Sequence, residues 1–152
     1  NNMDKSVNNN DIFKSIKESM GLKEINIVDY SPLTLAYIGD GIYEIVIRTM
    51  IVDEANRQVN KIHKAAADLV KAKTQSDMIL SLYEDLTEDE ARVYKRGRNA
   101  KAITRAKNAS MGDYRRATGF EAVMGYLYLT EQSERMMELI KKGLNNIKED
   151  KE

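Results

Sequence analysis

The chain has 152 residues, which suits one domain and is long enough to build a hydrophobic core without a disulfide or metal staple. It contains no cysteine, which excludes a disulfide framework and a cysteine-ligated zinc site. Its 24 basic and 24 acidic residues give a net charge of zero. This argues weakly against a nucleic-acid-binding protein, because such domains are usually basic. No apolar run reaches about 18 residues and the polar start lacks the apolar segment of a signal peptide, so we expect a cytoplasmic protein that spans no membrane.

The neutral total conceals a separation of charge along the chain. Residues 84–90 carry five acids, whereas residues 91–112 contain no acidic residue. The basic side chains of the second stretch are Arg92, Lys95, Arg96, Arg98, Lys101, Arg105 and Lys107. The sequence therefore predicts a local basic patch on a neutral protein, although a solvated helix end is the alternative interpretation of such a run.

Helical periodicity through most of the chain and a single proline indicate an all-α fold. In chain order, the predicted helices cover residues 12–20, 32–52, 58–71, 74–86, 87–99, 113–129 and 130–146. The boundary signals are Gly21 as a stop, Ser31-Pro32 as a start, and Thr87 with Glu90 as a capping box.

The last two predicted helices begin at polar residues. Asp113 is the expected N-cap of one, Thr130 begins the other, and residues 100–112 form a loop before them. We divide the chain into an N-terminal extension with a short helix (1–30), one helical domain (31–146) and a charged tail (147–152) that should fray.

Two predicted helices are apolar on nearly every side, and each carries a carboxylate near its middle. Asp40 lies between Gly39 and Gly41, and Glu121 follows Gly119 by two residues. A helix that is apolar all round is central in a fold, where an ionised carboxylate is costly unless it is paired or binds a metal. Glycines let another backbone approach closely, so we expect these helices to cross at their glycines and bring the two acids together. Two carboxylates, with one histidine and no cysteine in the chain, favour Mg²⁺ or Mn²⁺ over zinc.

An ion pair is the alternative interpretation of these buried acids. Glu44 and Arg48 are one helical turn apart and are expected to pair on one helix face. Arg115 and Arg116 are candidates to neutralise either of the two central acids, in which case no metal would be needed.

Several motifs occur together in the order found in a known family. The segment 37–44 (YIGDGIYE) resembles the ribonuclease III signature, in which an aspartate follows a glycine in a buried helix. FEA at 120–122 with GYL at 125–127 resembles the second acidic motif of that family. The stretches that resemble its Mini-ribonuclease III branch are LAYIGD (35–40), HK (63–64), KRGRNAK (95–101) and YR (114–115). The resemblance extends over residues 33–129 and implies that residues 31–146 are a helical catalytic domain.

By this resemblance, Asp40 matches the catalytic, metal-binding aspartate of the family and Glu121 its metal-ligating glutamate, with Mg²⁺ as cofactor and Mn²⁺ as a substitute. The larger family usually has two further acids, at positions where this chain has Ala36 and Thr118; the small branch shares this loss. Fewer protein ligands leave more water on each Mg²⁺, which that ion tolerates. The implied activity is metal-assisted hydrolysis of double-stranded RNA by a homodimer, with 5′-phosphate and 3′-hydroxyl products, in maturation of the large-subunit (23S) ribosomal RNA precursor.

The chain shows no second domain like the double-stranded-RNA-binding module of the larger family, so we expect the catalytic domain itself to bind RNA. The candidate RNA-binding residues are Arg98, Lys101, Arg105, Lys107 and Arg115, and the candidate supporting residues are Glu44, Asn99 and His63. A lone histidine is more often structural than catalytic. Basic side chains that contact phosphates make binding sensitive to salt.

Two other functions fit the same residues. One is a structured-RNA-binding protein with weak or no catalysis, because Ala36 and Thr118 lack carboxylates. The other is a helical scaffold whose acids are merely paired, which would have no affinity for RNA.

Overall fold

The computed structural model describes residues 12–24, 26–54, 59–100 and 110–150. Within these ranges the chain contains helices and no strand, which confirms the predicted all-α fold. The elements are α2 (Ile12–Met20), the 3₁₀ turn η1 (Ile27–Asp29), α3 (Pro32–Glu54), α4 (Val59–Val70), α5 (Ala72–Leu82), the 3₁₀ turn η2 (Tyr83–Asp85), α6 (Glu88–Asn99), α7 (Met111–Leu129) and α8 (Ser133–Asp150). No helix in the described ranges is long and apolar enough to cross a membrane.

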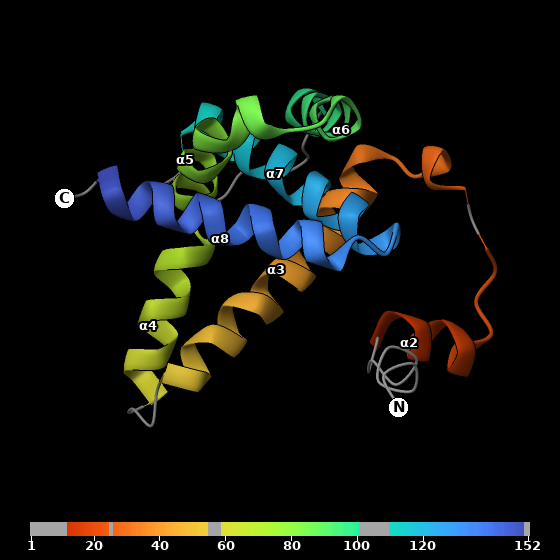
Figure 1. Ribbon diagram of the computed structural model, residues 1–152, viewed down its shortest axis with the longest axis horizontal. Coiled ribbons are helices and arrows are strands. Elements are labelled where there is room, and N and C mark those ends of the chain that lie inside the picture. The colour runs from red at the N-terminus through yellow and green to blue at the C-terminus, as the bar shows by residue number, and fades with distance from the viewer. Residues whose placement is uncertain (1–11, 25, 55–58, 101–109, 151–152) are drawn as a thin grey trace, which may run out of the picture.

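Helix α7 is the centre of the fold. It packs against α3, α5, α6 and α8, and these helices surround it in Figure 1. Phe120, Val123, Met124 and Leu127 of α7 are completely buried. The ring of Phe120 lies edge-on to that of Tyr43 of α3, with the ring centroids 5.2 Å apart. The expectation that this helix is central is confirmed.

Helix α7 begins earlier than predicted. Ser110 is its N-cap, and the Ser110 hydroxyl oxygen accepts a hydrogen bond from the Asp113 amide at 3.0 Å. Asp113 lies in the first turn, where a negative charge interacts favourably with the helix dipole. The prediction of Asp113 as the N-cap was therefore wrong, because a serine three residues earlier satisfies one of the free amides of the helix start.

Helix α8 begins later than predicted. Thr130 does not start it, because the Thr130 hydroxyl donates to the Tyr126 carbonyl at 2.7 Å and caps the end of α7. Glu131 then takes a positive φ of 58°, which interrupts the helical path, and α8 starts at Ser133.

The other end of α8 lies beyond residue 146. Leu144 and Ile147 pack against the core, and the helix continues to Asp150 because these contacts stabilise its last turns. The prediction that the helix ends near 146 was therefore wrong, and the fraying of residues 147–152 stays a prediction.

One face of α3 is exposed, contrary to the expectation of burial on all sides. Tyr43 and Ile47 are completely buried, but large apolar side chains lie open on the opposite face. The most exposed of them are Tyr37 (82% exposed), Ile45 (60%) and Val52 (61%). The apolar residues of α3 therefore form two surfaces. One packs into the core of this chain, and the other is exposed.

Helices α3 and α7 cross at a backbone-to-backbone contact. A Cβ atom built on Gly39 would overlap the Glu121 carbonyl oxygen and lie 2.8 Å from the Gly125 nitrogen. A Cβ on Gly125 would in turn overlap the Leu35 carbonyl oxygen. The two helices can approach this closely only because both positions lack a side chain.

Replacement of Gly39 by alanine should therefore destabilise the protein. The added methyl group must push α3 and α7 apart, and we expect the free energy of unfolding to fall by about 1–3 kcal/mol or more, as in other overpacked cores. Gly41→Ala is the matched control, because a Cβ there has nothing within 4 Å and alanine is the better helix former by up to about 1 kcal/mol. Urea unfolding measures both variants, and equal stabilities would contradict the close crossing.

Candidate active site

Asp40 and Glu121 lie together at the α3–α7 crossing. Gly39, the neighbour of Asp40, lies against the backbone carbonyl of Glu121, so the two side chains leave their helices at the same place. A side-chain hydrogen bond links the two carboxyl groups. Asp40 is exposed and Glu121 is partly buried, so one side of the pair is open to a ligand from solvent and the other faces the core.

The surroundings of Glu121 favour its protonated form. Burial has the largest effect, and the hydrogen bond and negative charge of Asp40 add to it, so that the pKa of Glu121 is raised to about 9. A hydrogen bond with Gln75 acts in the opposite direction and lowers this pKa. Two adjacent carboxyl groups do not both ionise readily without a positive charge beside them. At neutral pH the pair therefore holds either a proton or a cation.

The donor set fits a hard divalent cation. Both side chains offer carboxylate oxygens, which Mg²⁺ and Mn²⁺ prefer. In the part of the chain that the structure describes, no group of three or more acidic, histidine or cysteine side chains lies together. A cation between Asp40 and Glu121 would therefore keep several water molecules, which is usual for Mg²⁺.

The alternative interpretation, neutralisation by a basic side chain, is not seen among the described residues. No lysine or arginine there forms an ion pair with Asp40 or Glu121. The predicted pair of Glu44 and Arg48 is confirmed, at 2.7 Å. Arg116 binds side chains at the starts of α5 and α7 instead of the two central acids.

Two polar side chains lie near Glu121 on the buried side of the pair. Tyr43 is completely buried, its hydroxyl donates to the Leu69 carbonyl at 2.8 Å, and burial followed by the charge of Glu121 raises its pKa. Gln75 is also buried, and its Nε2 donates to the Val70 carbonyl at 2.8 Å. Sequence reasoning does not single out Gln75, because Glu121 is distant in the chain and only the packing of α5 on α7 brings the two together.

Comparisons with known proteins agree with this geometry. The family model described as the ribonuclease III domain matches residues 33–132. The chain belongs to the ribonuclease III family. It is 51% identical over 125 residues to a Mini-ribonuclease 3 of Clostridium tetani (82% of this chain, 80% of that one). It is 52% identical over 110 residues to a Mini-ribonuclease 3 of Enterococcus faecalis (71% and 83%). A crystal structure of a protein from Fusobacterium nucleatum matches with a TM-score of 0.72 and 30% identity, over 81% of this chain and 98% of that chain.

These relatives confirm the predicted Mini-ribonuclease III branch, and family membership supports an endoribonuclease that acts on double-stranded RNA. In this ribonuclease III domain, the two positions where the larger family usually has further acids are Ala36 and Thr118, and both are buried. The Thr118 hydroxyl donates to the Tyr114 carbonyl at 3.0 Å. Neither side chain can therefore act as an anionic ligand, and Asp40 with Glu121 are the carboxylates that remain.

Of the residues predicted to bind RNA in this ribonuclease III domain, Arg98 and Arg115 lie on either side of residues 101–109 in the sequence. Arg98 is partly buried near the end of α6, with its guanidinium carbon 5.4 Å from the centroid of the Tyr94 ring. Asn99 is the exposed last residue of α6, and Arg115 is exposed near the start of α7. The remaining candidates, Lys101, Arg105 and Lys107, lie outside the described residues.

The other candidate supporting residues lie on different elements. His63 is exposed on α4, and the Glu44 carboxylate of α3 is bound to Arg48. Among the described residues, the structure brings Asp40 and Glu121 together at the α3–α7 crossing, and the roles of Glu44, Asn99 and His63 stay predictions.

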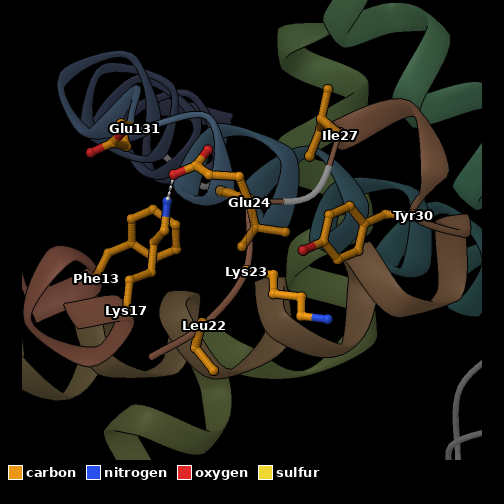
Figure 2. A pocket seen from close by; sticks show the side chains of 9 residues that line it. Phe13, Lys17, Leu22, Lys23, Glu24, Ile27, Tyr30 and Glu131 are labelled. Carbon is orange, nitrogen blue, oxygen red and sulfur yellow. Dashed lines mark hydrogen bonds and ion pairs between the residues drawn. The ribbon is translucent and has the colours of Figure 1, made fainter. Parts of the chain in front are cut away.

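A cavity of about 280 Å³ lies elsewhere, between α2, η1 and the end of α7 (Figure 2). Its lining residues are Phe13, Lys17, Leu22, Lys23, Glu24, Ile27, Tyr30, Leu129 and Glu131. Lys17 Nζ donates to the Glu24 carboxylate at 2.7 Å, as the dashed line in Figure 2 marks. The cavity includes neither Asp40 nor Glu121, so it is separate from the candidate active site.

The raised pKa of Glu121 predicts how the metal-free protein responds to pH. A carboxyl group whose folded pKa lies above the unfolded value of about 4.3 stabilises the fold fully below that value, and the contribution is lost as pH rises through the folded pKa of about 9. In EDTA, the wild type should lose stability relative to Glu121→Gln between about pH 5 and pH 9, by less than the roughly 1.4 kcal/mol per pH unit that one proton permits. Urea unfolding across this range measures the difference, and parallel curves for the two proteins would contradict it.

Proposed function

We propose that the chain is a Mg²⁺-dependent endoribonuclease that hydrolyses double-stranded RNA as a homodimer. The observation that carries the proposal is the pair of carboxyl groups, Asp40 and Glu121, held in hydrogen-bonding contact at the α3–α7 crossing. The match to the ribonuclease III domain supports the same class of reaction. A chain without cysteine needs no protein nucleophile if a metal supplies the activated water.

Asp40 and Glu121 would hold the Mg²⁺, directly or through water, and Mn²⁺ should substitute because it accepts the same oxygen ligands. When bound, the ion activates a water nucleophile and stabilises the leaving oxygen of the phosphodiester. Glu121 must release its proton to ligate a cation, and the exposed side of Asp40 admits the RNA strand. The proposed products carry 5′-phosphate and 3′-hydroxyl ends.

The proposed RNA contacts come from the basic side chains at the α6–α7 junction. Arg98 and Arg115 flank residues 101–109. We assign Lys101, Arg105 and Lys107, which lie within this stretch of the sequence, to the same set of RNA contacts. A-form RNA presents phosphates and 2′-hydroxyl groups, so binding should weaken strongly as salt rises. The likeness to the Mini-ribonuclease 3 branch supports the precursor of large-subunit ribosomal RNA as the substrate, and hence a cytoplasmic site of action.

The exposed face of α3 supports the homodimer. Tyr37, Ile45 and Val52 follow one another at intervals of eight and seven residues, so they share one face of the helix. All three are largely exposed. Large apolar side chains gathered on one surface mark an interaction site, and a second copy of the chain presents the same self-complementary face.

Substitution on this face tests the dimer. Tyr37→Glu should convert the protein to a monomer, because the charge would be buried without a partner at the interface. Leu80→Glu is the matched control, since Leu80 is similarly apolar and exposed but lies on α5; it should leave the dimer intact. Sedimentation equilibrium measures both variants, and a wild type that is monomeric at micromolar concentration would overturn the dimer proposal.

Cleavage of a long duplex RNA tests the proposed chemistry. The wild type should cut with Mg²⁺ and not with EDTA, and Asp40→Asn should lower the rate by on the order of 10³-fold or more while RNA binding is retained. A wild type that binds but never cuts, with any divalent ion or precursor-like substrate, would instead be a structured-RNA-binding protein. A wild type with no affinity for RNA would support the scaffold interpretation.

A further inference from the structure

A buried amide oxygen on α5 has no hydrogen-bond partner. Gln75 is 2% exposed, and its Nε2 donates to the Val70 carbonyl at 2.8 Å. Because a carbonyl can only accept, this bond fixes which end of the amide is nitrogen and which is oxygen. The Gln75 Oε1 is left without a partner, and it is the only buried side-chain nitrogen or oxygen in that state among the described residues. A buried polar atom left alone is costly, so it calls for an explanation such as a bound water or ion.

The residue that carries this oxygen lies beside the acid pair. Helix α5 packs on α7, and Gln75 is close enough to Glu121 to lower the pKa of its carboxyl group. The neighbours of Gln75 on both sides have used their polar atoms elsewhere: the Thr74 hydroxyl donates to the Asp68 carbonyl at 2.6 Å, and the Ser76 hydroxyl oxygen accepts from Arg116 Nε at 2.7 Å. Of these three neighbouring residues, only Gln75 therefore keeps a side-chain oxygen without a hydrogen-bond partner.

The end of α4 prevents the Gln75 side chain from turning away. Three successive carbonyls, at residues 68–70, accept side-chain hydrogen bonds from Thr74, Tyr43 and Gln75, all between 2.6 and 2.8 Å. These bonds satisfy carbonyls that a helix end leaves free, and the bond from Gln75 Nε2 to the Val70 carbonyl holds the Gln75 amide in one orientation beside Glu121.

We propose that Gln75 is a positioning residue of the metal site, which holds the Glu121 carboxylate in place and offers Oε1 as the hydrogen-bond acceptor for a water molecule that accompanies the cation. The inference rests on the proposed function. A cation held by two carboxylates keeps several waters, and each of them needs acceptors. Ala36 and Thr118 provide no carboxylate for this purpose, whereas the neutral Gln75 amide provides an acceptor without adding a third negative charge.

Thermal unfolding of the metal-free protein titrated with MgCl₂ tests the role of Gln75 without measuring activity. The wild-type melting temperature should rise with Mg²⁺, with a midpoint concentration that reports affinity. Gln75→Met has a similar length but neither donor nor acceptor, and it should raise the midpoint about tenfold or more. Gln75→Glu keeps an oxygen at this place, and its midpoint should equal or fall below that of the wild type. Thr74→Val is the matched control, which should lower the melting temperature but keep the wild-type midpoint.

The outcomes separate the inference from the function it rests on. A Gln75→Met protein that is less stable but has the wild-type midpoint would show a merely structural role and overturn the inference, while the Mg²⁺ response of the wild type would still support the proposed function. No Mg²⁺ response in the wild type would overturn both. If Gln75→Met does not fold, Gln75→Glu decides, because a midpoint clearly above that of the wild type contradicts an oxygen acceptor at this position.

Discussion

The candidate site depends on the close contact of the α3 and α7 backbones. Because Gly39 and Gly125 carry no side chains, the carbonyl groups of Glu121 and Leu35 occupy the space that a Cβ would need. This contact fixes both the distance between the helices and their register. The side chain of Glu121 starts from the residue whose carbonyl touches Gly39, and Asp40 is the next residue along α3, so the packing of the two central helices also forces two acids together.

That closeness creates an electrostatic problem that a proton or a cation resolves. Burial and the proximity of Asp40 raise the pKa of Glu121 to about 9, so a bare pair of carboxylates is unfavourable at neutral pH. The chain limits this repulsion by having Ala36 and Thr118 where the larger family usually has acids. Around the remaining pair it places neutral polar groups, the Tyr43 hydroxyl and the Gln75 amide, both bound to carbonyls at the end of α4. A site with few charges and several fixed dipoles suits an ion that retains much of its water.

The sequence predicted the helices, the crossing and the acid pair because their signals are local: glycines beside acids in apolar helices, and capping residues such as Thr87, whose capping box is present. It did not distinguish Gly39, which is in contact, from Gly41, which is not, because that depends on which face of α3 meets α7. For the same reason the apolar residues of α3 could not be divided into core and exposed stripe. The C-terminal limit of α8 follows from the packing of Ile147, and the place of Gln75 beside Glu121 from the contact of α5 with α7. Both depend on contacts between residues that are far apart in the chain, and no local sequence pattern predicts them.

The most direct test of the central claim is to locate a bound ion. Crystals of the protein grown with Mn²⁺, measured at the manganese absorption edge, give an anomalous difference map that marks the metal alone. The account predicts a peak at the α3–α7 crossing, within bonding or water-bridged distance of carboxylate oxygens from both Asp40 and Glu121. A fully formed crossing with no peak at saturating Mn²⁺, or a peak bound only to other residues, would contradict the claim that this pair of acids is a metal site.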